Sequence, residues 1–160
     1  MQHAFSQAST ASLDAAHAQR LQCQRQWRGF LSALGQEFAE ALPAQELTVL
    51  MARIGMRFAA QHPLAASDTL PGLQQAMNAV WDALDWGVVE LSQSSAGMEI
   101  RHRFSPLVAA FGEAAGGWAV GFLQGAYQQW FDAAGASGLK VQAAGAPDAL
   151  GSVQLRLVTA

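Results

Sequence analysis

Charge is scarce in this sequence. Only 13% of its 160 residues are charged, about half the usual share, and Lys140 is the only lysine. With a formal net charge of −3, the chain has no basic patch to neutralise phosphates, which excludes nucleic acid as a partner. Because 51% of the residues are hydrophobic, we expect much of the uncharged surface to be covered by other copies of the chain or by partner proteins.

Cysteine is nearly absent as well. Cys23 is the only one, so an internal disulfide and a cysteine-based zinc site are excluded, and a reducing compartment fits best. The first 20 residues also lack the basic start and the continuous apolar run of a secretory signal. We therefore expect a cytoplasmic protein; a periplasmic location is the alternative, which no signal peptide supports.

Small polar residues dominate the N-terminus. Residues 1–12 are rich in Ser, Gln, Ala and Thr, and we expect them to form a mobile tail. Residues 13–160 contain no linker, so they are predicted to form one domain. A chain of this length buries roughly 70% of its unfolded surface, which is enough for a core without disulfides or metals.

Apolar residues at steps of three and four predict three helices in the first half of the chain. These helices cover residues 13–42, 44–62 and 70–84. The first is expected to be interrupted near Gly29 or Gly35. Pro63 ends the second, because the residue before a proline is pushed out of helical geometry. Asp68 and Thr69 can cap the third.

The period changes to two in the second half. The alternating side chains that share one face are Val89, Leu91, Met98, Ile100, His102 and Phe104, and then Leu139, Val141, Val153, Leu155 and Leu157. The first six predict a hairpin and the last five predict two terminal strands. Each strand set has one apolar face, so we predict an α+β fold with helices packed on one face of a small antiparallel sheet of about four strands.

A long helix is predicted between the two strand sets, from Pro106 to about Ala134, with a break at Gly116 and Gly117. Its glycines at 117, 121 and 125 lie four residues apart among bulky side chains. The apolar run is shorter than the roughly 20 residues that a membrane span requires. The glycines also lack the Lys, Ser or Thr of a phosphate-binding loop.

Close helix packing therefore explains this stretch best, since glycines every four residues form a flat groove for a neighbouring backbone. The neighbour could belong to the same chain or to another copy of it, and both alternatives stay open here. The residues expected at this close-packing or oligomer interface are Gly117, Trp118, Gly121, Phe122, Gly125 and Tyr127.

Residues capable of catalysis are scattered. The histidines are His3, His17, His62 and His102, and no pair of them has the spacing of metal ligands on one helix face. Alternation points His102 inward, which favours a hydrogen-bonded core histidine. Asp82 and Asp85 are expected on a solvated helix face, and Cys23 is expected to be a bystander thiol. We predict no catalytic residue, no cofactor and no metal, and hence no enzyme.

The order of segments resembles the bacterial cellulose synthase operon protein D family, from about Trp27 to Thr159. The segments that carry the resemblance are "FLSALGQEFAEAL", "LMARIGMRFAAQHPL", "LQQAMNAVWDALDWGVVELS", "EIRHRFSPL", "WAVGFLQGAYQQWFDAAGAS" and "VQLRLVT". The most recognisable elements are the helix "ARIGMRFA", the junction Trp86-Gly87 and the aromatic helix around Gly125. None of these is a catalytic signature.

This resemblance implies a non-catalytic accessory or scaffold component of the cellulose synthesis and secretion complex. It implies a homo-octamer built from dimers, contact with the cellulose synthase complex and with a proline-rich partner protein, and a role in the export and crystallisation of nascent glucan chains. The missing signal peptide favours a cytoplasmic scaffold. Residues 1–24 form a longer N-terminus than the family pattern has, so we transfer no glucan-binding residue from it.

A second family of domains, with a different function, has a similar order of elements. The sequence is loosely similar to small α+β domains of the vinyl-reductase type, which serve in trafficking complexes and as ligand sensors. Such a domain would dimerise and hold an apolar ligand between its helices and its sheet. Low charge and abundant aromatic residues do not separate this alternative from the cellulose scaffold.

Overall fold

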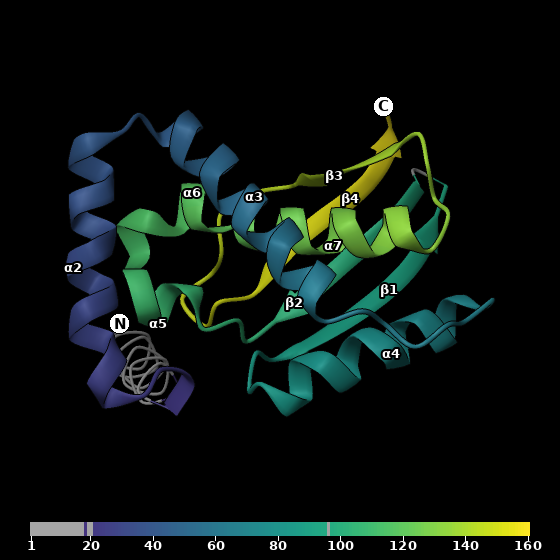
Figure 1. Cartoon of the computed structure of the whole chain (residues 1–160), viewed down its shortest axis with the longest axis horizontal. Helices are drawn as coiled ribbons and strands as arrows, with labels where there is room; N and C mark the ends of the chain where they lie inside the picture. The colour runs from purple at the N-terminus through teal and green to yellow at the C-terminus, as the bar shows by residue number, and fades with distance from the viewer. Residues whose placement is uncertain (1–17, 19–20, 96) are drawn as a thin grey trace, which may run out of the picture.

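The computed structural model describes residues 18, 21–95 and 97–160. Its centre is a four-stranded antiparallel sheet in the order β1-β2-β4-β3 (Figure 1). The strands are β1 (Val88–Ser94), β2 (Gly97–Arg103), β3 (Leu139–Ala143) and β4 (Val153–Thr159). Helix α7 (Gly121–Ala133) lies across one face of the sheet, and α3 (Ala44–Gln61) packs against α7. The predicted α+β class is confirmed.

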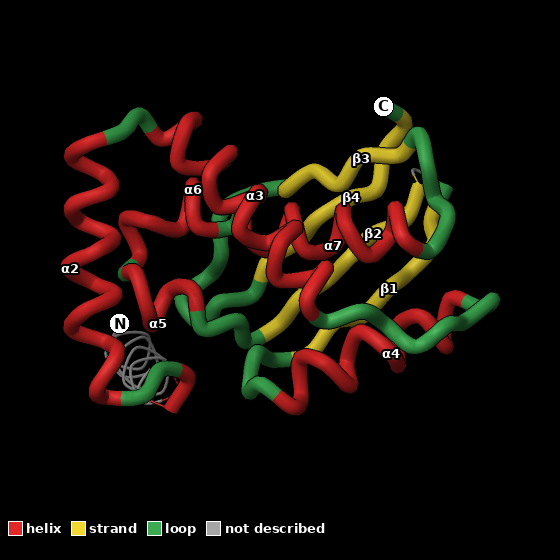
Figure 2. Tube along the Cα trace, in the orientation of Figure 1, coloured by secondary structure: helices red, strands yellow, loops and turns green. Residues whose placement is uncertain are grey.

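The middle helices begin and end at the residues that the sequence indicates. Helix α3 lies between Pro43 and Pro63, and α4 (Leu70–Ala83) runs beside β1 (Figure 2). The hydroxyl of Thr69 accepts a hydrogen bond of 3.1 Å from the backbone N–H of Gly72, which satisfies one of the unpaired donors at the start of α4.

The first helix differs from its prediction. Helix α2 (Arg25–Ala41) is continuous through both Gly29 and Gly35, where an interruption was expected. The break lies earlier, at Gln24, whose backbone is extended with φ −62° and ψ 141°. Gly35 is buried within the helix, where an added side-chain carbon would lie 3.1 Å from the ring of Phe111. The mobile tail predicted for residues 1–12 lies outside the described residues.

The long helix predicted after Pro106 is divided. It consists of α5 (Leu107–Phe111), a 3₁₀ turn η1 (Glu113–Ala115), α6 (Gly116–Ala119) and α7. The break predicted at Gly116 and Gly117 is wrong, because both glycines lie within α6. The chain turns at Gly112, whose φ of +86° is a conformation that side-chain-bearing residues rarely adopt.

The two faces of the sheet differ in polarity, as the alternation predicts. Ile100, Val141 and Leu155 are buried beneath the helices, whereas Arg101 and Arg156 are exposed on the opposite face. Phe104 was expected on the buried face, and that prediction is wrong. It follows the end of β2 with φ +62° and is 43% exposed, because the reversed backbone turns its side chain away from the core.

Side-chain amides from the helices cap both edges of the sheet. Asn78 of α4 donates to the carbonyl of Val89 and accepts from its N–H, each at 2.8 Å. Gln128 of α7 accepts from the N–H of Val141 at 2.8 Å and donates to the carbonyl of Leu139 at 3.0 Å. These amides satisfy backbone groups that an unprotected edge strand would offer to another strand.

Candidate functional site

The crossing of α3 and α7 brings two backbones into direct contact. A side-chain carbon added to Gly121 would lie 2.5 Å from the carbonyl oxygen of Thr48, and one added to Gly125 would overlap the carbonyl of Ala52. In the opposite direction, a side chain at Gly55 of α3 would overlap the carbonyl of Phe122. Three glycines on two helices therefore make this close approach possible.

The residues predicted for the close-packing or oligomer interface lie in different environments. Gly121 and Gly125 line the contact with α3, while Trp118, Phe122 and Tyr127 are buried in the core of the same chain. Gly117 is exposed, with no atom within 4 Å of an added side-chain carbon. The contacts in the structure are thus contacts within one chain, and an oligomer interface at this helix stays a prediction.

Gly55 was missed by sequence reasoning. It lies in the segment "ARIGMRFA", and it belongs to a series of buried residues spaced by four along α3. The other members of that series are Leu47, Met51 and Ala59. A glycine at a buried position of a predicted helix, facing a second helix with glycines at the same spacing, was the signal that could have found it.

The α3–α7 crossing yields a matched pair of substitutions. Gly121→Leu should lower the free energy of unfolding by about 1 to 3 kcal/mol, because the new side chain must displace the α3 backbone. Gly117→Leu is the control, since it replaces a helical glycine that faces open space and should be neutral or slightly stabilising. Thermal unfolding of both variants checks this, and equal melting temperatures would contradict the packing described here.

A buried chain of hydrogen bonds joins three elements beneath the sheet. The indole N–H of Trp81 donates to the hydroxyl oxygen of Tyr127 at 3.0 Å, and that hydroxyl lies 2.6 Å from Nδ1 of His102. Nε2 of His102 lies 2.7 Å from the carbonyl oxygen of Trp86. A carbonyl only accepts, so Nε2 carries the proton, Nδ1 accepts, and the Tyr127 hydroxyl donates to it.

The junction between α4 and β1 places the last acceptor of this chain. Gly87 has φ +89°, and a side chain there would overlap the carbonyl of Arg103. This turn directs the Trp86 carbonyl toward the sheet, where His102 reaches it. Glycine adopts this backbone conformation without strain, which explains why a glycine follows Trp86 at this junction.

Burial keeps both titratable members of the chain neutral. Desolvation lowers the pKa of His102 from 6.5 to about 4, although the hydrogen bond to the Trp86 carbonyl opposes this shift. Desolvation also raises the pKa of Tyr127 well above its usual value, against the bond from Trp81. Both side chains are 0% exposed, so neither reaches a substrate at the surface. Their arrangement is suited to holding elements together.

The shifted pKa of His102 predicts an effect of pH on stability. Between pH 6.5 and about 4 the unfolded chain binds a proton at this residue that the folded chain does not. The free energy of unfolding should therefore fall as the pH falls through this window, by about 3 kcal/mol in total. Denaturation of the wild type and of His102→Gln checks this: the contribution should be absent from the variant, and parallel pH profiles would contradict it.

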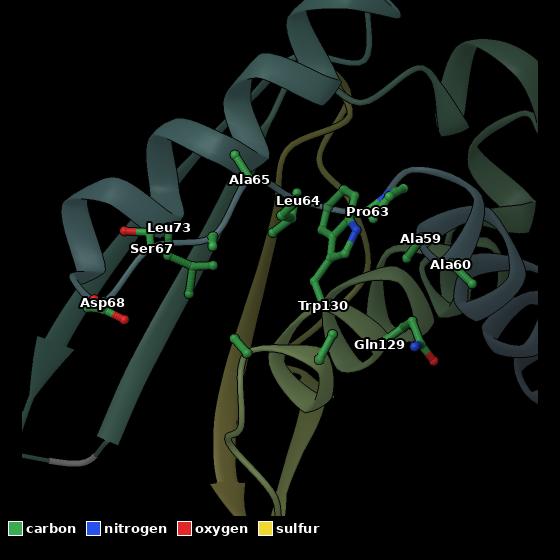
Figure 3. A pocket seen from close by; sticks show the side chains of 13 residues that line it. Ala59, Ala60, Pro63, Leu64, Ala65, Ser67, Asp68, Leu73, Gln129 and Trp130 are labelled. Carbon is green, nitrogen blue, oxygen red and sulfur yellow. The ribbon is translucent and has the colours of Figure 1, made fainter.

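A shallow cavity of about 500 Å³ opens between the end of α3, the segment before α4 and the end of α7 (Figure 3). Apolar side chains, six of them alanines, line most of it, with Ser67, Asp68 and Gln129 as polar groups. Trp130 lies at its wall but is 2% exposed, and its indole N–H already donates to the His62 carbonyl at 2.9 Å. This lining offers no nucleophile paired with a base.

The remaining candidates from the sequence do not form a site. Asp82 and Asp85 are exposed, as predicted, but only Asp82 lies in α4, because the helix ends before Asp85, whose φ is +56°. Cys23 is buried with its Sγ 3.8 Å from the Gln24 carbonyl. His3 and His17 lie outside the described residues. Among residues 18, 21–95 and 97–160, no three His, Cys, Asp or Glu side chains are grouped for a metal ion, and no helix is long and apolar enough to cross a membrane.

Comparisons with known proteins agree with the resemblance seen in the sequence. Two similar proteins, from Komagataeibacter xylinus and Komagataeibacter sucrofermentans, are each named cellulose synthase operon protein D. Each is 30% identical over 103 residues, which are 63% of this chain and 66% of the relative's own length. The sequence model of the family described as the D subunit of cellulose synthase matches residues 13–158. The chain therefore belongs to the family of cellulose synthase D subunits.

Proposed function

We propose that this protein is a non-catalytic accessory component of bacterial cellulose production. It acts as a scaffold that organises synthase complexes, so that glucan chains are exported together and crystallise. The observation that carries this proposal is the state of His102 and Tyr127, whose pKa values are both strongly shifted. Strongly shifted groups commonly mark active sites, but here both are sealed in the core and bonded to each other.

The chemistry of polymerisation explains why the burial of His102 and Tyr127 favours a scaffold. Glycosyl transfer from a nucleotide sugar needs groups that stabilise charge on the departing phosphates and a base within reach of the acceptor hydroxyl. The cavity between α3 and α7 presents one carboxylate, one hydroxyl and one amide among apolar side chains. These groups could contact a polar ligand, but they do not form a constellation that drives group transfer.

The partners proposed for this scaffold are other copies of the chain, in a homo-octamer built from dimers, and the cellulose synthase complex. A proline-rich cellulose operon protein and nascent glucan chains complete the proposal. We place the protein on the cytoplasmic side of the membrane. Membership of the family and the 51% hydrophobic composition, which favours covered surfaces, support an assembled state.

Deletion of the protein from a cellulose-producing cell tests the function. Isolated membranes should still polymerise UDP-glucose, because the transfer chemistry lies elsewhere, while intact cells should deposit less cellulose or cellulose that is disordered. Incorporation of labelled glucose into glucan and diffraction from the cell-made product measure the two effects. Membranes that lose all polymerisation would contradict the scaffold.

Complementation of the deletion sharpens this test. Asp82→Ala changes an exposed carboxylate and should restore normal cellulose, whereas Gly121→Leu disturbs the α3–α7 crossing and should restore less. Immunoblotting of both variants controls for protein abundance. A folded and abundant Asp82→Ala protein that fails to restore cellulose would point to direct chemistry.

A further inference from the structure

The cavity shown in Figure 3 lies where two helices end. Ala60 belongs to the last turn of α3, Ala133 is the last residue of α7, and both residues line the cavity. Residues 63–68, which join α3 to α4, form another wall. The volume of about 500 Å³ lies within the range of roughly 300 to 1,000 Å³ that is typical of small-molecule sites. The charges around the cavity decide which kind of ligand it suits.

The ends of α3 and α7 make this cavity electronegative. Aligned peptide dipoles leave the equivalent of about half a negative charge at the C-terminus of a helix, where the last carbonyl groups have no partner within the helix. The carbonyl oxygens of Ala60 and Ala133 accept no hydrogen bond from another described residue. Neither helix has a basic residue in its last turn, and no Lys, Arg or His is among the described residues that line the cavity. A ligand with a positive charge is therefore favoured here.

Asp68 adds a full negative charge from the segment before α4. The sequence suggested that this carboxylate helps to cap α4, but the hydroxyl of Thr69 accepts the capping bond from Gly72. Asp68 is exposed, and its side chain has no hydrogen bond or ion pair with another described residue. The side chain of Gln129 on α7 is unbonded in the same sense, so its amide oxygen is also free to accept. The cavity thus combines an unpaired carboxylate with unused neutral acceptors.

Apolar side chains form the rest of the lining. Six of them are alanines, and Leu64 and Leu73 lie half-buried beside these. The small side chains leave room for a compact apolar body, and the leucines offer it a surface to contact. Ligands that carry phosphate or carboxylate are disfavoured, because their charge would face Asp68 and two helix C-termini. A ligand that fits has one positive end and an apolar remainder.

We propose that this cavity binds a primary alkylammonium ion, with Asp68 as its counter-ion and the alanine and leucine side chains against its alkyl chain. An ammonium group has three N–H donors and no acceptor. This matches a site whose free polar groups are a carboxylate, backbone carbonyls and an amide oxygen. A free amine and the lysine side chain of another protein carry the same group. The inference goes beyond the scaffold function and does not depend on it.

Three linear probes of equal chain length test the preference for positive charge. At neutral pH hexylamine is a cation, hexan-1-ol is neutral and hexanoate is an anion. Calorimetry should rank their affinities in that order, and NMR of alanine methyl groups should place bound hexylamine at Ala60 and Ala133. Hexanoate that binds as tightly as hexylamine, or hexylamine that shows no saturable binding, would overturn the proposal.

Matched substitutions test the counter-ion and the location. Asp68→Asn keeps the shape of the side chain but removes its charge, so hexylamine should bind about twofold to fivefold more weakly, as expected for a solvent-exposed ion pair, while hexan-1-ol should bind as before. Ala133→Leu narrows the cavity and should weaken both probes. Asp82→Asn is the control, because Asp82 is an exposed carboxylate that does not line the cavity. Unchanged hexylamine binding by folded Asp68→Asn, or an equal loss in Asp82→Asn, would contradict the site.

Two further probes identify the source of the ammonium group. A short blocked peptide with a single lysine presents the group as a partner protein would. Binding as tight as that of hexylamine assigns the site to a protein lysine, whereas weaker binding assigns it to a free amine. Cellobiose is the neutral sugar probe, and a preference for cellobiose over hexylamine would rule out the ammonium ligand. None of these experiments measures cellulose deposition, so their failure would leave the scaffold function standing.

Discussion

The close approach of α3 and α7 is the constraint on which the rest of the structure depends. Glycines at 55, 121 and 125 let two backbones meet where side chains would keep them apart. Each glycine inside a helix costs about 1 kcal/mol relative to alanine, so the contact must offset that cost through packing. Because α7 is fixed against α3 at this crossing, the residues that follow along α7 are placed with little freedom.

Three consequences of that placement are visible. Phe58 of α3 contacts the rings of Phe122 and Trp130 on α7, with ring centres 5.2 Å and 6.3 Å away. Tyr127, half a turn beyond Gly125, reaches Trp81 and His102 and so joins α7 to α4 and β2. The next residue, Gln128, reaches the outer strand β3. One backbone contact thus orients the aromatic core, the buried hydrogen bonds and one capped sheet edge.

The sequence predicts those features that depend on neighbours along the chain. Periods of 3.6 and 2 located α3, α4 and the hairpin, because one buried face imposes them locally. The helix breaks lie at Gln24 and Gly112, whereas the sequence predicted them at other residues. The packing around a helix decides which glycine or polar residue ends it. Gly55 and the edge-capping Asn78 were missed for a related reason: their partners lie far away in the chain. Gly55 stands out only when its helix is compared with the glycine spacing of α7, and no local pattern indicates the role of Asn78.

The central claim is that the polar interior of this protein holds the fold together and performs no chemistry. The most direct measurement is cellulose deposition, per amount of folded protein, by cells that carry His102→Gln in place of the wild type. The amide can still donate to the Trp86 carbonyl but cannot shuttle a proton as imidazole does. We predict deposition equal to that of the wild type. A folded, abundant variant that deposits no cellulose would contradict the claim and assign His102 a chemical role.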